Sequence, residues 1–131
     1  MQVRIHSVES MPGDTGRWRV RFESELGTAT ATWVGERPQP GAEYGAELEV
    51  PEVRWGQELR EAPEGGPALG DEPGGVWIRG VLGQVWDGVG WIALGRWGFQ
   101  VAIEGATEGA PRAGAVVIVR VPILELFDTR I

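Results

Sequence analysis

Residues able to do acid–base or nucleophilic chemistry are few in this chain. His6 is the only histidine, and it lies beside alternating apolar residues near the start of the sequence. A nucleophilic relay would also need an activated serine, but Ser7, Ser10 and Ser24, the only serines, lack the glycine-flanked elbow that exposes such a nucleophile. We therefore expect no catalytic residues and no enzymatic activity.

The carboxylates and glycines predict no stronger site. Glu43, Glu47 and Glu49 alternate along one segment, and like charges along one strand usually mark its solvent face rather than a glycosidase pair. Because the chain has no cysteine, thiolate metal sites are excluded, and no acidic spacing matches a calcium loop. The glycine-rich segment 83–90 is predicted to be a hairpin, so it leads into no phosphate-binding helix. We expect neither a metal nor a cofactor.

The seven tryptophans are the most informative residues. Seven indoles exceed what the core of so small a chain needs, so we expect one or two to be partly exposed, as at binding hot spots. A predicted hairpin also sets Arg79 opposite Arg96, which is unfavourable unless a carboxylate separates them, the hairpin bends, or they bind an anion. The predicted binding residues are Trp33, Glu43, Glu47, Glu49, Trp55, Arg79 and Arg96.

The chain as a whole is acidic, with a net charge of −7 at pH 7. This charge repels nucleic acids and anionic membranes, and it steers a basic protein toward the surface. The sequence has no apolar stretch long enough for a signal peptide or a membrane span, so a cytoplasmic location is expected. The absence of lysine and asparagine beside abundant glycine, alanine, proline and arginine is typical of a GC-rich bacterial genome.

Strands must position these residues, because 21 glycines and nine prolines interrupt nearly every window long enough for a helix. Most segments between turns alternate apolar and polar residues, as half-buried strands do. Asp87-Gly88 is a strong hairpin signal, and it predicts that Trp86 pairs with Val89 and Leu82 with Ala93. Residues 55–62 fit either a short helix or a strand followed by a turn.

The two halves of the sequence resemble each other at an offset of 71 residues, the separation of Pro51 and Pro122. Each half contains a strand, a hairpin, further strands, a Val-Pro pair and a short final strand, which indicates an internal duplication. A proline after the fourth strand cannot donate to a ladder, so it should mark a corner or a switch between sheets. Residues 61–75 lack periodicity and are predicted to be a linker or a long loop.

We therefore expect an all-β fold of two tandem five-stranded small barrels of the OB or SH3 kind, produced by internal duplication and packed together. The alternative is a single ten-stranded sandwich or barrel. The predicted units are residues 1–60 and 76–131, joined by the linker or loop at 61–75.

This fold and composition favour a non-catalytic module that binds a protein partner, and the charge favours a basic one. Acidic bacterial immunity proteins and adaptor proteins share this general character, although no motif here belongs to any such family. The alternative is a β-domain that binds a small ligand or carbohydrate on exposed tryptophan faces. A dimer is compatible with either function.

Overall fold

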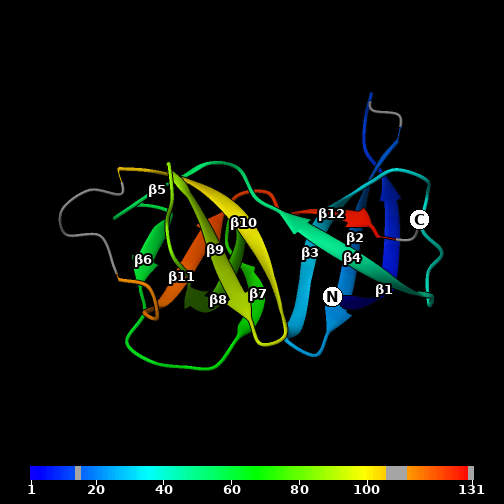
Figure 1. Cartoon of the computed structure of the whole chain (residues 1–131). Helices are drawn as coiled ribbons and strands as arrows, with labels where there is room; N and C mark the ends of the chain where they lie inside the picture. Colours follow the sequence, from blue (N-terminus) through cyan, green and yellow to red (C-terminus); the bar gives the residue numbers. More distant parts are fainter. Residues whose placement is uncertain (14–15, 106–111, 130–131) are drawn as a thin grey trace.

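Two β-barrels make up the computed structural model, which describes residues 1–13, 16–105 and 112–129. Figure 1 shows them side by side, the first mainly in blue and cyan and the second in green, yellow and orange. The described residues contain no helix, and therefore none with the length and hydropathy needed to cross a membrane. The prediction of an all-β fold with two small barrels is confirmed, and the single ten-stranded alternative is not what the chain adopts.

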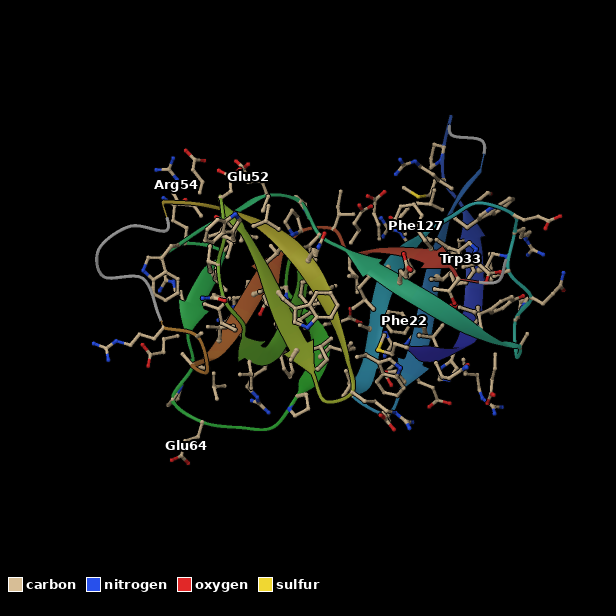
Figure 2. The ribbon with its side chains drawn as sticks, in the orientation of Figure 1. Phe22, Trp33, Glu52, Arg54, Glu64 and Phe127 are labelled. Carbon is tan, nitrogen blue, oxygen red and sulfur yellow. The ribbon has the colours of Figure 1, made fainter. Side chains whose placement is uncertain are left out.

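The first barrel is closed, in the strand order β1-β2-β3-β12-β4, with β4 pairing back onto β1. Alternation along its strands places Val3, Ile5, Val20 and Phe22 in its interior. Figure 2 shows Phe22 and Trp33 among these strands. The strands are β1 (Gln2–Ser10), β2 (Arg17–Ser24), β3 (Gly27–Val34), β4 (Glu43–Glu49) and β12 (Glu125–Asp128).

The second barrel is nearly closed, in the order β5-β10-β9-β8-β11-β6, with β7 paired to β8 beside this path. A single bridge between Trp55 and Leu59 joins its two end strands. Residues 55–62 accordingly contain a turn and strand β6, and no helix. The strands are β5 (Val53–Arg54), β6 (Leu59–Glu61), β7 (Ala68–Glu72), β8 (Gly75–Leu82), β9 (Val89–Leu94), β10 (Trp97–Glu104) and β11 (Val116–Val121).

The strands repeat along the chain at the predicted offset. A shift of 71 residues carries β1, β2, β3, β4 and β5 onto β8, β9, β10, β11 and β12 respectively. Strands β6 and β7 lie between the two sets and have no counterpart among the residues that the structure describes. The structure therefore supports the internal repeat at the level of strand order.

The two halves exchange their fifth strands. Strand β5 from the first half pairs in parallel with β10, and β12 from the second half pairs in parallel with β3. The crossings occur after Pro51 and Pro122, so the prediction that these prolines mark a switch between sheets is confirmed. In Figure 1 the red strand β12 lies within the first barrel. The predicted units 1–60 and 76–131 are therefore both wrong at their ends, because β12 completes the first barrel while β5 and β6 belong to the second.

The predicted linker 61–75 contains an ordered strand. Strand β7 pairs with β8 throughout its length, and Leu69 buries its side chain in the core. The Leu69 backbone N–H also donates to the Leu26 carbonyl oxygen over 3.0 Å, which ties β7 to the first barrel. The sequence did not predict this strand, because its five residues show no apolar–polar alternation and prolines and glycines flank them on both sides.

The turn at Asp87-Gly88 is confirmed, but the predicted register beyond it is wrong. Trp86 pairs with Val89, and Asp87 has a positive φ of 51°, as a tight hairpin turn requires. Further along, Leu82 pairs with Ile92 instead of Ala93. An extra residue within 83–85 shifts the register by one, and this shift turns both Leu82 and Ile92 into the core.

Candidate functional site

An open groove of about 460 Å³ lies where β4 and β12 of the first barrel approach β9 and β10 of the second. Phe127, labelled on β12 in Figure 2, belongs to the first-barrel side of this groove. The residues that line it are Glu47, Leu48, Glu49, Trp91, Gly98, Phe99, Gln100 and Phe127. We call this region the inter-barrel groove.

Trp91 is the principal aromatic side chain of the inter-barrel groove. It points outward from β9, and 46% of it is exposed. A Cβ added at Gly98 on the adjacent strand β10 would lie 2.5 Å from Cε2 and Cζ2 of the Trp91 ring. The indole therefore lies directly over Gly98, and only glycine leaves it room there.

The carboxylates of the groove come from β4. Glu47 and Glu49 alternate along this strand, and both are exposed. Within the described part of the chain, the side-chain carboxylate of Glu49 forms no hydrogen bond or ion pair, and its direct cross-strand neighbour is Glu125 of β12. Glu47 lies near the Met1 ammonium group, whose pKa is lowered by burial, an effect that the charge of Glu47 opposes. Glu49 is therefore the carboxylate that is free to meet a ligand.

Gln100 adds an amide beside the indole. It is exposed and is the direct cross-strand neighbour of Trp91 on β10. On the opposite side, Phe127 pairs with Glu47 across β12 and β4, so the two side chains share one face. The groove thus combines three aromatic side chains, those of Trp91, Phe99 and Phe127, with an amide and two carboxylates.

Among the predicted binding residues, Glu47 and Glu49 alone line this groove. Trp33 is 1% exposed, packs against Tyr44 and donates its indole N–H to the Glu36 carbonyl oxygen over 3.0 Å. Its assignment to a surface patch is therefore wrong, because alternation along β3 turns Trp33, with Ala29 and Ala31, into the interior of the closed first barrel.

Glu43 and Trp55 lie elsewhere on the molecule. Glu43 forms an ion pair with Arg4, at 2.6 Å between carboxylate and guanidinium. Trp55 is half-buried against the core, and its backbone N–H donates to the backbone carbonyl oxygen of Glu104 on β10. The predicted binding patch, in which the acidic residues of β4 lie beside Trp33 or Trp55, is therefore not formed.

Arg79 and Arg96 do not face each other, because the pairing of β8 with β9 is confined to residues 81 and 82 of β8. Arg79 instead lies between β7 and β11, with its Nε donating to the Gly66 carbonyl oxygen over 2.9 Å. Each guanidinium stacks on an indole, Arg79 on Trp77 and Arg96 on Trp97. The predicted like-charge pair is wrong, and its proposed anion site loses its basis.

Trp91, Gln100 and Phe127 are the groove residues that sequence reasoning missed. Their convergence depends on the exchange of β12 into the first barrel. Pro122 marks the crossing, but nothing in the sequence says which barrel the last strand joins. One signal was present: the 86–94 segment is apolar on both faces, and only one of those faces can be inside a barrel.

The other candidate residues show simpler environments. The His6 Nε2 lies 3.2 Å from the Glu23 carboxylate on the outer surface of the first barrel. The Ser24 hydroxyl accepts from the Leu26 backbone N–H within a turn. The described residues include no group of three or more histidine or acidic side chains that could hold a metal ion.

Comparison of this chain with protein-family models, curated proteins and solved structures finds no match. The groove is therefore interpreted from its own chemistry. An exposed indole face attracts cations, and carboxylate and amide oxygens accept hydrogen bonds from cationic groups or from sugar hydroxyls.

Proposed function

We propose that this chain is a non-catalytic module that binds a basic protein partner at the inter-barrel groove and along the adjoining hairpin. The observation that carries this proposal is a cluster of exposed apolar side chains, one of which, Trp91, shares the inter-barrel groove with the acidic strand β4. Val81, Trp86, Val89 and Trp91 are each at least 38% exposed, and all lie on the β8–β9 hairpin.

These four side chains share one face of the hairpin. Trp86 pairs with Val89, Val81 pairs with Ala93, and Val89, Trp91 and Ala93 alternate along β9. Contiguous exposed apolar surface with a polar rim is typical of protein interaction sites. Glu47 and Glu49 supply that rim on the groove side.

The net charge of −7 sets the sign of the preferred partner. A basic surface is attracted to an acidic one over long range, which raises the association rate. Acidic immunity proteins and adaptors act by occupying a partner's surface in this way, and a role of either kind is consistent with the proposed site.

The test is selection of a displayed random peptide library against the full chain. We expect enrichment of basic peptides that also carry apolar residues, with binding that weakens as salt is raised. Trp91→Ala should weaken the selected peptides by about 30-fold, the effect of losing a hot spot of about 2 kcal/mol. Glu49→Gln should also weaken them.

The control for charge is Glu9→Gln, which removes the same charge from an exposed position on β1. Binding should survive this change. Selection of neutral or acidic peptides, or equal losses in Glu49→Gln and Glu9→Gln, would reject the proposal.

A carbohydrate ligand is the second candidate, favoured by the placement of Gln100 beside Trp91. Sugar rings stack on indoles, and amides and carboxylates bind their hydroxyls. Binding in a glycan array that is lost in Trp91→Ala, together with no selection of basic peptides, would favour this candidate.

A further inference from the structure

Arginine covers indole rings repeatedly on this surface. The Arg37 guanidinium carbon lies 5.7 Å from the Trp18 ring centroid, Arg79 lies 5.7 Å from Trp77, and Arg96 lies 4.5 Å from Trp97. These are cation–π distances. Three half-buried indoles are thus each covered by a guanidinium of the chain itself.

Trp91 departs from this pattern. Among the described residues no cation lies over its ring, and its neighbours on the same face of β9 are Val89 and Ala93. Its cross-strand neighbour is the neutral Gln100. The indole lies directly over Gly98 of β10, although it is one of the most exposed rings.

Glu47 and Glu49 line the same groove from the first barrel. A guanidinium is planar, stacks on an aromatic face and presents a fork of N–H donors that matches a carboxylate. An ammonium is a compact, strongly hydrated charge that can use the carboxylate but gains less from the ring. The two walls of the groove together therefore favour arginine over lysine.

We propose that the inter-barrel groove receives one arginine side chain of the partner, with the guanidinium stacked on Trp91 and its N–H groups directed to Glu49. This inference rests on the proposed function, because it names the residue by which a basic partner would be recognised. It predicts that a single arginine contributes most of the contact in the groove, as an anchoring residue does.

The probe is N-acetyl-L-arginine amide, titrated into the ¹⁵N-labelled full chain and followed by the indole N–H resonances. The resonance missing from a Trp91→Phe spectrum identifies Trp91. We expect it to shift saturably, with a dissociation constant on the order of millimolar for so small a ligand. The lysine amide should bind at least about threefold more weakly, and the citrulline amide, which is neutral and nearly isosteric, should cause no saturable shift.

Glu49→Gln should weaken the arginine amide by about threefold or more, and Glu9→Gln should leave its binding unchanged. The remaining indole resonances report whether each variant is folded. Equal affinity for arginine and lysine, equal shifts of all the indoles, or no effect of Glu49→Gln would overturn the inference.

The two proposals can fail separately. Selected peptides that bind equally well after arginine is replaced by lysine would retain the proposed function and reject the arginine site. Saturable binding of the arginine amide at Trp91 without any enrichment of basic peptides would reject the protein-binding function and retain the arginine site.

Discussion

Trp33 and Trp86 are at opposite extremes of burial. Trp33 is 1% exposed and keeps its indole hydrogen bond to Glu36, whereas Trp86 is 80% exposed at the tip of a tight hairpin. A buried indole that retains a hydrogen bond contributes apolar area without leaving a polar group unpaired. An exposed one contributes little to the fold and is available to a partner.

Trp33→Ala should therefore lower the free energy of unfolding by about 3–5 kcal/mol, because it leaves a large cavity in the first barrel. Trp86→Ala should change it by less than about 0.5 kcal/mol, since a surface site loses almost no packing. Guanidinium denaturation of both variants provides the measurement. Similar losses of stability in the two variants would contradict the difference in burial between Trp33 and Trp86.

At the scale of the elements, the exchange of fifth strands decides how the molecule is built. Leu126 of β12 is completely buried and pairs with Trp33 of β3 and Leu48 of β4, far from both in the sequence. The final strand of the chain therefore belongs to the core of the barrel that begins it. Parallel pairing between β12 and β3 is possible because the chain returns from the second barrel after Pro122.

Leu126→Ala should lower stability by about 2–5 kcal/mol, and its local effect should appear in the first barrel. We expect amide hydrogen exchange measured by mass spectrometry to accelerate first in β3 and β4, the two strands that flank β12. Loss of protection confined to β10 and β11 would instead mean that the last strand belongs to the second barrel.

At the scale of the whole molecule, the barrels are joined by more than the exchanged strands. The Asp71 carboxylate of β7 accepts from the Thr30 backbone N–H of β3 over 2.8 Å and pairs with Arg21 of β2 at 2.9 Å. The backbone bond from Leu69 to Leu26 lies at the same junction. These contacts and the two crossings make it difficult for one barrel to unfold alone.

Calorimetry should accordingly show one unfolding transition, with a ratio of van't Hoff to calorimetric enthalpy of about 1. Asp71→Ala should shift this transition to lower temperature as one peak, at a cost of about 0.5–1.5 kcal/mol, because the hydrogen bond to the Thr30 N–H lies at an exposed site where water can replace it. Asp71→Asn can still accept that hydrogen bond and should cost less. Two resolved transitions in the unaltered chain would show that the barrels unfold independently.

The candidate site was predictable only in part. The outward alternation of Glu47 and Glu49 follows from the pattern along β4, and both line the groove. The exposure of Trp91 could not be read in the same way, since β9 is apolar on both faces. Trp33, in contrast, shares one face of β3 with Ala29 and Ala31, while three threonines point the other way. The extra residue near Gly83 also changed the pairing across this hairpin, so that Val81, and not Leu82 as predicted, lies on the same face as Ala93.

The sequence by itself determined the strands other than β7, the turn at Asp87-Gly88, the corners at Pro51 and Pro122 and the acidity, because each depends on residues adjacent in the chain or on composition alone. Only the tertiary structure decided which barrel each fifth strand completes and which indoles, those of Trp86 and Trp91, remain exposed. Those outcomes depend on pairings such as Leu126 with Trp33, and on the groove that brings Trp91 near Glu49. The residues involved are distant in sequence and become neighbours only when both barrels close.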